Sequence, residues 1–437
     1  MKESEQRPLL SQETLEHIHH CNKCGLCMAA CPVYKELLVE SASPRGKVQL
    51  SRHVMEGDLE ITPKVKEILS KCLLCGSCVA ACPSGVQGDR LFSGLRWRAT
   101  QRYGVDWKKR VLFQVLARPW MTSASARMGR WARALVPKWA EANMRAGNLP
   151  LDRIPPLNER PFAAEAPEMT KAQGELRARV MYFHGCATNY LFADVGQAVL
   201  SVLSRMGVEV ITPKGQGCCG VPIFLSGARE AAVECIAQVI KVFGREDVDA
   251  VVVDCATCGA ALVKEYPHML RELAQLGENV GEDIMEGSRI LAQKAKDVTA
   301  FVGDHMSWLP DLLEGGPKLK VTYHDPCHLL KGQGVAILPR KVLASLPNLE
   351  FVEMEEPDAC CGGGGSFQVE HPDVSAAITA RKIKSIDGTG AQAVATGCPG
   401  CRITIGAHLD PRKQMRVLHP VQLVRWALEP DSASELP

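Results

Sequence analysis

The stretches CNKCGLCMAACP at residues 21–32 and CLLCGSCVAACP at residues 72–83 are near copies of each other. Each holds four cysteines in the spacing C-x2-C-x2-C-x3-C and ends on a proline. Three thiolates two residues apart can surround one metal cluster from a tight loop, whereas the fourth stands at the start of a helix that proline turns away. The two stretches therefore predict a pair of metal clusters in one unit.

This spacing is the bacterial ferredoxin signature for [4Fe-4S] clusters, in which the fourth cysteine of one run binds the cluster of the other run. We expect cluster 1 on Cys21, Cys24, Cys27 and Cys82, and cluster 2 on Cys72, Cys75, Cys78 and Cys31. Zinc is the alternative, but zinc takes four ligands from paired knuckles rather than a four-thiolate run closed by proline. VYKELLVE (33–40) and VKEILSK (65–71) have helical patterns, so residues 1–95 are expected to form a helical two-cluster ferredoxin domain.

Ten further cysteines form two sets of five in the rest of the chain. The first set is Cys186, Cys218, Cys219, Cys255 and Cys258, and the second is Cys327, Cys360, Cys361, Cys398 and Cys401. Equivalent cysteines of the two sets are 141 to 143 residues apart. This agreement indicates an internal duplication.

The residues around these cysteines alternate between strand-like and helix-like patterns. RARVMYFHGC (177–186), VDAVVVDCATC (248–258) and AQAVATGCPGC (391–401) are strand-like runs that end on cysteines, and FADVGQAVLSVLSRMG (192–207) is helical. Such alternation predicts parallel sheets. Because ligands of these sheets gather beyond the carboxyl ends of the strands, the cysteines of each set should converge there. We expect an α/β fold with two duplicated, Rossmann-like units at residues 176–316 and 317–437, after a linker region at 96–175.

Glycines follow both cysteine doublets, Gly220 after the first and residues 362–365 after the second. Two adjacent cysteines that point at one metal centre need an unusual turn, which glycine allows. A nucleotide-binding loop is not indicated, because no G-x-G-x-x-G follows a strand with an acidic residue about 20 positions later.

The pattern C-x31-CC-x35-C-x2-C followed by C-x32-CC-x36-C-x2-C resembles the tandem cysteine-rich (CCG) domains of heterodisulfide reductase and its relatives. Two ferredoxin motifs followed by two such domains are similar to the iron–sulfur subunits of glycolate oxidase and bacterial D-lactate dehydrogenases. The arrangement also resembles the fused catalytic subunit of membrane heterodisulfide reductase and the third subunit of anaerobic glycerol-3-phosphate dehydrogenase. HDPCHL (324–329) and PRGK (44–47) strengthen the match.

The resemblance implies a cofactor for each five-cysteine set. In heterodisulfide reductase an intact set holds a noncubane [4Fe-4S] cluster that cleaves a disulfide, and both sets are complete here. We therefore expect two cubane clusters in the N-terminal domain and up to two further [4Fe-4S] clusters in the CCG domains. One cubane on four of the five cysteines of each set remains an alternative.

The resemblance also implies a function. The chain shows no flavin or nicotinamide fingerprint, and we assign no catalytic residue to it. We expect an electron-transfer subunit of a flavin-linked 2-hydroxy-acid (lactate or glycolate) dehydrogenase, which receives electrons from an FAD-containing subunit and passes them to a quinone, a cytochrome or another membrane carrier. The enzymatic alternative is a heterodisulfide reductase-type subunit. A zinc-binding scaffold is the alternative from a different class.

Composition and the N-terminal sequence limit the class of protein and the cellular compartment that we expect. The chain has 437 residues, 46% hydrophobic and 23% charged, with a net charge of +2, which is ordinary for a globular protein and gives no reason to expect a nucleic-acid partner. Aromatic residues make up only 5%, which is too few for a surface that stacks nucleic-acid bases. The polar N-terminus shows no signal peptide, so the 19 cysteines are expected in a reducing compartment, where they hold metal rather than pair. We predict a cytoplasmic protein, with peripheral contact to the inner face of the membrane as a further possibility.

The segment 96–145 carries 12 lysines or arginines against two acidic residues. Five of the chain's seven tryptophans lie in it: Trp97, Trp107, Trp120, Trp131 and Trp139. This mixture suits an interfacial helix or a docking surface. A helical linker that packs tryptophans between two domains explains it equally well.

A few single residues need separate predictions. Cys235 has no counterpart in the second repeat and is expected to be a buried small side chain. His184, His324 and His328 flank the first cysteine of each set and are expected to form hydrogen bonds around the clusters. Lys264 and Glu265 are expected to be surface charges.

Overall fold

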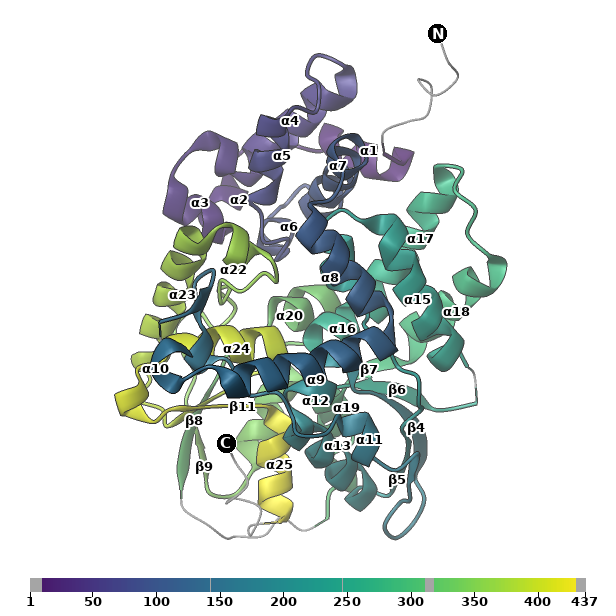
Figure 1. Ribbon diagram of the computed structural model, residues 1–437, viewed down its shortest axis with the longest axis vertical. Coiled ribbons are helices and arrows are strands. Elements are labelled where there is room, and N and C mark those ends of the chain that lie inside the picture. Colours follow the sequence, from purple (N-terminus) through teal and green to yellow (C-terminus); the bar gives the residue numbers. More distant parts are fainter. Residues whose placement is uncertain (1–9, 142, 246, 311–317, 430–437) are drawn as a thin grey trace.

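The computed structural model describes residues 10–141, 143–245, 247–310 and 318–429. Figure 1 shows a helical N-terminal part in purple, a helical connector in blue that runs across one face, and two α/β units in teal to yellow. The fold is therefore α/β with an N-terminal helical ferredoxin domain, as the sequence predicts. None of the helices in these ranges is both long and apolar enough to cross a bilayer.

The N-terminal helices begin at residues suited to helix starts. Ser11, Ser43 and Thr62 each accept a hydrogen bond from a backbone N–H in the first helical turn. The domain contains α1 (Gln12–His19), α2 (Leu26–Ala30), α3 (Pro32–Leu37), the 3-10 turn η2 (Glu40–Ala42), α4 (Pro44–Glu56), α5 (Pro63–Ser70), α6 (Ser77–Ala80) and α7 (Gly88–Tyr103). The expected boundary at residue 95 lies inside α7, which leads directly into the connector.

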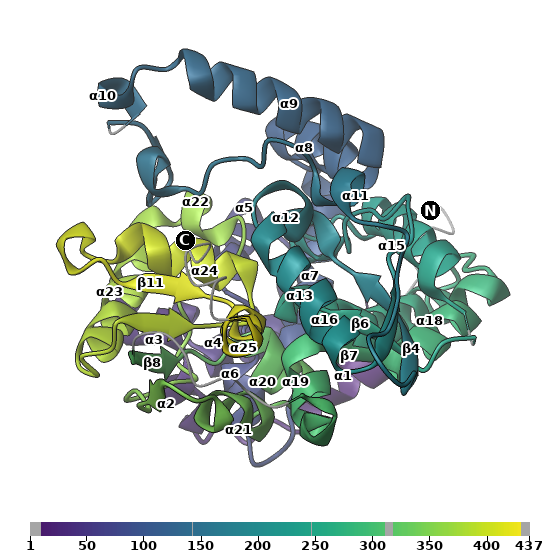
Figure 2. The same ribbon diagram turned by 90° about the horizontal axis from the view of Figure 1, so that it is seen from below.

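The connector is helical in its first half. It contains α8 (Trp107–Ala117), α9 (Pro119–Leu135), α10 (Lys138–Glu141), the antiparallel pair β1 (Arg145–Ala146) and β2 (Leu149–Pro150), the 3-10 turn η3 (Leu151–Arg153) and α11 (Phe162–Glu165). Trp97 is buried, whereas Trp107, Trp120 and Trp131 are 69%, 69% and 74% exposed. The side chain of Trp139 lies outside the described part. The linker explanation therefore fits Trp97 alone, and Figure 2 shows α8 and α9 along an outer edge of the molecule.

The first α/β unit is built on a sheet of strand order β3-β5-β4-β6-β7. Its strands are β3 (Met169–Thr170), β4 (Ala178–Phe183), β5 (Val208–Ile211), β6 (Ala250–Val253) and β7 (Ala295–Asp297). Its helices are α12 (Gly185–Tyr190), α13 (Ala193–Arg205), α14 (Val221–Leu225), α15 (Arg229–Phe243), α16 (Ala256–Ala260), the π-helix η4 (Ala261–Glu265), α17 (Tyr266–Gln275), α18 (Glu282–Lys294), α19 (Val298–Asp304) and the 3-10 turn η5 (Met306–Trp308). All strand pairs are parallel except β3 with β5, and β3 comes from the stretch expected to be linker.

The second unit has an all-parallel sheet of order β11-β10-β8-β9. Its strands are β8 (Leu319–Tyr323), β9 (Leu349–Phe351), β10 (Ala393–Ala395) and β11 (Arg416–Leu418). Its helices are α20 (Cys327–Gln333), α21 (Ile337–Ser345), α22 (Phe367–Glu370), α23 (Pro372–Asp387), α24 (Pro399–His408), the 3-10 turn η6 (Pro411–Lys413) and α25 (Pro420–Leu428). The expected boundary at 316/317 lies outside the described residues.

The strand orders show that the two units are structural copies. The order β9-β8-β10-β11 in the second unit repeats β5-β4-β6-β7 of the first. Between the last two strands, α16 of the first unit corresponds to α24 of the second. The first unit then adds η4, α17 and α18, whereas the second adds only the short turn η6. The duplication inferred from the cysteines is therefore also a duplication of topology, with an added helical layer in the first copy.

The two units share one hydrophobic core. The C-terminal helix α25 packs on α13 of the first unit, so that Val199 and Leu203 belong to the same cluster as Val424 and Leu428. The amide of Gln422 donates a hydrogen bond of 2.6 Å to Asp194 across this contact. This shared core fixes the two cysteine-bearing sheets relative to each other.

A buried ion pair joins the N-terminal domain to the first unit. Arg229 on α15 donates to Glu272 on α17 at 2.5 Å, and the two side chains are 0% and 1% exposed. The Arg229 guanidinium lies over the ring of Trp97 on α7, and Glu272 accepts a hydrogen bond from the hydroxyl of Thr14 on α1. Both partners of the pair therefore contact the ferredoxin domain.

Replacing Arg229 with Met should destabilise the protein by about 3–5 kcal/mol, because it leaves the buried carboxylate of Glu272 without its cation. The double change Arg229→Met with Glu272→Met should be closer to the wild type. Urea unfolding followed by tryptophan fluorescence would measure both variants. Equal midpoints for the single and double variants would contradict this account of the pair.

Candidate metal centres

The ferredoxin domain brings its eight cysteines together around two adjoining pockets. Cys21, Cys24, Cys27 and Cys82 line one pocket, and Cys31, Cys72 and Cys75 line the next, while Cys78 lies between the two and borders both. The crossing arises because α2 lies against α6, and each of these short helices carries the chain toward the other run. Gly25 and Gly76 precede the two helices with φ of 87° and 71°, a left-handed conformation that glycine adopts readily.

Backbone N–H groups point at the sulfurs of the two crossing cysteines. The N–H of Tyr34 lies 3.4 Å from the Sγ of Cys31, and the N–H of Val86 lies 3.4 Å from the Sγ of Cys82. Hydrogen bonds to cluster sulfurs are one means by which a protein sets a cluster's reduction potential. These two amides would therefore act on any cluster that the crossed sets hold.

The electrostatics of this domain favour a bound cation. Burial raises the pKa of Cys31 to about 11 and raises the pKa of Cys78 well above its ordinary value. A thiol in such surroundings ionises only when a compensating cation is present, as in metal binding. Lys47 supplies part of this charge, since its ammonium is buried near Cys31 and Cys72. The residues fit an iron–sulfur cluster in each set.

The two five-cysteine sets meet in one cavity of about 320 Å³ between the two α/β units. All ten cysteines line it, and each follows a strand or starts the helix beyond one, as the strand pattern predicts. Gly220 and Gly362 come directly after the doublets with φ of 75° and 88°. In each doublet the glycine N–H lies 3.4 Å from the first sulfur, that of Cys218 or Cys360.

The thiols of each set lie close enough to affect one another. The sulfurs of Cys361 and Cys401 are 3.2 Å apart. Hydrogen bonds from neighbouring thiols lower the pKa of Cys219 and of Cys398 to about 6. Lys382 is buried beside the second set, where its ammonium donates to the carbonyl oxygen of Glu356 at 2.7 Å. A sulfur-rich, buried donor set of this kind suits soft metal centres such as iron–sulfur clusters.

The second set adjoins the ferredoxin domain. The thiol of Cys75 lies within hydrogen-bonding reach of Cys360, and Cys72 and Cys75 line the same cavity as the ten cysteines. The two sets in turn approach each other, since the hydroxyl of Thr257 lies 3.6 Å from the Sγ of Cys398. The cysteines thus form a continuous series from the surface of the ferredoxin domain to the centre of the molecule.

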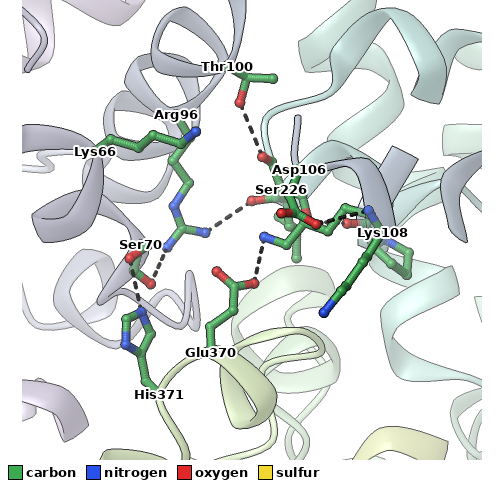
Figure 3. A network of polar contacts seen from close by, with 12 residues as sticks. Lys66, Ser70, Arg96, Thr100, Asp106, Lys108, Ser226, Glu370 and His371 are labelled. Atoms are coloured by element: carbon green, nitrogen blue, oxygen red, sulfur yellow. Dashed lines mark hydrogen bonds and ion pairs between the residues drawn. The ribbon is translucent and has the colours of Figure 1, made fainter. Parts of the chain in front are cut away.

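A polar network on one side of this cavity joins the three parts of the chain (Figure 3). The guanidinium of Arg96 on α7 donates to the carbonyl oxygens of Leu69 at 2.7 Å and Leu225 at 3.0 Å. Lys109 on α8 forms an ion pair of 2.7 Å with Glu370 on α22. Sequence patterns gave no sign of these roles or of the buried Lys47 and Lys382, because basic residues in helical segments usually face solvent.

The histidines around the sets differ in their contacts. The ring of His328 is 2.9 Å from the hydroxyl of Thr257, which itself approaches Cys398, so His328 has the outer position expected for it. His184 packs edge-on against Phe162 and Tyr182. Burial and the charge of Lys382 lower the pKa of His324 to about 3, so its imidazole is neutral at physiological pH.

Two single-residue predictions had opposite outcomes. Cys235 is buried within α15, as expected. Lys264 and Glu265, however, are not free surface charges: Lys264 pairs with Asp89 of α7 at 3.2 Å, and burial raises the pKa of Glu265 to about 7. The expectation was wrong because the contact comes from a helix 175 positions earlier in the chain.

Comparisons with known proteins agree with this architecture. A 4Fe-4S dicluster domain matches residues 17–86, and a cysteine-rich domain matches twice, at residues 180–263 and 321–406. The probable glycolate oxidase iron-sulfur subunit of Bacillus subtilis is 30% identical over 94% of this chain and 93% of its own length. One subunit of the dihydromethanophenazine:CoB–CoM heterodisulfide reductase of Methanosarcina mazei is 25% identical over 96% of both chains.

One solved structure has a similar fold. The crystal structure of a hypothetical protein from Helicobacter pylori matches 97% of this chain and 74% of its own, with a TM-score of 0.52 at 10% identity. This likeness concerns the fold alone.

The crossed assignment can be tested by iron and sulfide analysis of double variants. Cys24→Ser with Cys82→Ser should lose no more iron than either single variant, about four atoms per chain, because both residues belong to one set. Cys75→Ser with Cys82→Ser should lose about twice as much. Cys235→Ser is the control and should keep the full content. Equal losses in the two double variants would contradict the crossing.

Proposed function

This chain belongs to the family of dicluster ferredoxin proteins with tandem cysteine-rich domains that includes glycolate oxidase iron–sulfur subunits, and we propose that it is the electron-transfer subunit of a flavin-linked 2-hydroxy-acid dehydrogenase. In this function a partner flavoprotein oxidises lactate or glycolate to the 2-oxo acid, with loss of two electrons and two protons. The electrons then pass through this chain to a membrane carrier such as a quinone. The quinone takes up two electrons and two protons.

The continuous series of cysteine sets is the observation that carries this proposal. One set of the ferredoxin domain reaches the surface, where Cys24 is exposed. The next set adjoins Cys360 through Cys75, and the cavity beyond holds the ten remaining cysteines. Clusters bound in these sets would supply one-electron redox chemistry. The chain's own residues would hold the clusters in line, and they bury eight of the ten cysteines around the cavity.

Exposed apolar residues beside the first set suggest where the flavoprotein docks. Leu26, Leu38 and Val39 are 57%, 72% and 50% exposed around the loops that carry Cys24 and Cys31. Large apolar side chains exposed near a redox centre are typical of a transient protein interface. We therefore place the electron donor at this end of the series.

If the proposed function is right, reduction of the clusters by a 2-hydroxy acid requires the partner flavoprotein. Glycolate or D-lactate should reduce the clusters of the purified holoprotein only when a flavoprotein from the native complex is present, as followed by EPR of rapidly frozen samples. The chain alone should show no reduction by either acid, since its sequence shows no flavin fingerprint. Reduction without a flavoprotein would contradict the proposal, and a colourless protein with zinc and little iron would contradict any redox role.

Disulfide reduction is the second candidate, favoured by the completeness of both sets and by the cavity that they share. A disulfide there would take up two electrons and two protons and leave as two thiols. The holoprotein with an artificial electron donor would then produce free thiols from a small disulfide. Absence of thiol release, together with flavoprotein-dependent reduction, would favour the electron-transfer function.

We further propose that helices α8 and α9 dock the protein on an anionic membrane. Helix α9 has no buried residue, and its bulky apolar side chains Trp120, Met128, Trp131 and Leu135 are 68–83% exposed. These residues recur three, four or eight positions apart and therefore share one face of the helix. The side toward the protein instead carries polar contacts: the hydroxyl of Ser123 lies 2.8 Å from that of Tyr190, and the guanidinium of Arg133 donates to the carbonyl oxygen of Ile154 at 3.0 Å.

The charge of this surface favours lipid over protein as its partner. The segment 106–135 carries seven lysines or arginines and only one acidic residue, Asp106. Among the described residues, Lys108, Arg110, Arg118 and Arg127 form no ion pair with an acidic side chain. Exposed tryptophans with unpaired cations match the interface of an anionic bilayer, whereas the centres of protein interfaces are depleted in charge.

Vesicle sedimentation would test this membrane contact. The wild-type holoprotein should bind phosphatidylglycerol-containing vesicles and not pure phosphatidylcholine, with binding weakened by salt. Trp120→Gln, Trp131→Gln and Leu135→Gln together should weaken binding at least about tenfold, because each buries apolar area in the interface. Ile337→Gln, at another exposed apolar residue, is the matched control. Unchanged binding of the triple variant would contradict the assignment of this surface.

A further inference from the structure

We propose that His324 is a nitrogen ligand to the cluster held by the second five-cysteine set, and that the first set has no equivalent ligand. The proposal rests on the proposed function only for the presence of clusters. It adds a residue of a different chemical type to the ten-cysteine pattern.

The position of His324 is set by the end of a strand. It follows β8 directly and precedes the segment that leads to Cys327 at the start of α20. Its side chain is 1% exposed, and a ring nitrogen and the sulfurs of Cys361 and Cys401 all lie within 4.8 Å of one another. This is the distance range in which three donor atoms can share one metal centre.

The imidazole is also a buried polar group with its hydrogen-bonding capacity unused. Neither Nδ1 nor Nε2 of His324 makes a hydrogen bond of normal length and angle with a described residue, and its polar neighbour on the chain is the backbone of Pro357. An unpartnered polar side chain in a dry interior carries a free-energy cost, so such groups usually have a ligand or a water that the protein chain itself does not provide. Here the neighbouring donors are thiols, and a metal that binds them would also satisfy a ring nitrogen.

The first unit shows what the same position looks like without this ligand. Strand register places Phe183 at the end of β4 where His324 follows β8, since Tyr182 and Tyr323 occupy equivalent pairings with β6 and β10. The ring of Phe183 is fully buried and packs edge-on against Phe243. It also lies near Gly185, whose close neighbours include the Sγ of Cys258, the counterpart of Cys401. The duplication has therefore placed an apolar ring at one site and a nitrogen donor at the other.

A neutral nitrogen ligand changes the redox properties of a cluster. In Rieske centres, histidines in place of cysteines raise the reduction potential well above that of all-cysteine ferredoxins. A cluster that His324 ligates should therefore be easier to reduce than one bound by thiolates alone. The two copies of the cysteine-rich unit would then hold clusters of different potential in spite of their equal cysteine sets.

Pulsed EPR on the full-length holoprotein labelled with 15N-histidine tests the proposal directly. The reduced wild type should show one strongly coupled histidine nitrogen, and a redox titration should show that His324→Phe lowers the potential of one cluster while the others stay unchanged. The coupling should disappear in His324→Phe, which copies the residue of the first unit, and persist in His184→Phe, the matched control beside the first set.

Two results would overturn the assignment. The first is the absence of strong nitrogen coupling in the labelled wild type, which can be judged even if His324→Phe fails to hold its cluster. Weak coupling alone would make His324 a hydrogen-bond donor to sulfur rather than a ligand. Retention of the strong coupling in His324→Phe would assign it to another histidine. Iron analysis of the wild type comes first, because a protein without iron would contradict the proposed function and not the choice of ligand.

Discussion

The gathering of buried thiols around one cavity is the constraint on which the rest of the structure depends. Thiolate charge is penalised in a medium of low dielectric, and burial, together with the charge of neighbouring thiolates such as Cys72, raises the pKa of Cys78 well above its ordinary value. The buried ammonium groups of Lys47 and Lys382 offset part of this free-energy cost. Lys47 lies beside the second cysteine set of the ferredoxin domain, and Lys382 lies beside the second five-cysteine set. Thiols in such numbers are stable together as anions only around a polycationic centre, which is what an iron–sulfur cluster provides.

Duplication gave the protein two equal cysteine sets, but the surrounding structure makes them unequal. Cys360 of the second set lies next to Cys75 of the ferredoxin domain, so the second unit is directly connected to the cluster-binding helices. The first unit instead carries the extra helices α17 and α18 and anchors the ferredoxin domain through Arg229 and Glu272. One copy therefore adjoins the cysteines of the N-terminal domain, while the other contacts that domain through a buried ion pair.

The sequence predicted those parts of the site that depend on local spacing. The gathering of the eight ferredoxin cysteines follows from the C-x3-C-P spacing, from which the crossing of Cys31 and Cys82 stays a prediction, and the convergence of the ten other cysteines follows from their positions after strands. Features that depend on contacts between distant segments were not predictable. Examples are β3, which joins the first sheet as an antiparallel edge, and Lys264, which pairs with Asp89 of another domain. A basic residue in a helical segment gives no sign of which helix will later cover it.

For the basic connector (residues 96–145), the sequence fits a docking surface and a linker that packs its tryptophans equally well, and the structure distinguishes between them. A linker that packs its tryptophans would bury them, and Trp97 is indeed buried against Arg229. Helix α9 does the reverse, since it exposes Trp120 and Trp131 to solvent and contacts the protein through polar side chains such as Ser123 and Arg133. A helix that needs only to cover a domain gains no stability from this arrangement, because apolar area left in water contributes nothing to folding. The neighbouring helix α8 places Lys109 in the polar network beside the ten-cysteine cavity, so contact of α8 and α9 with a bilayer would bring the cavity close to carriers dissolved in the membrane.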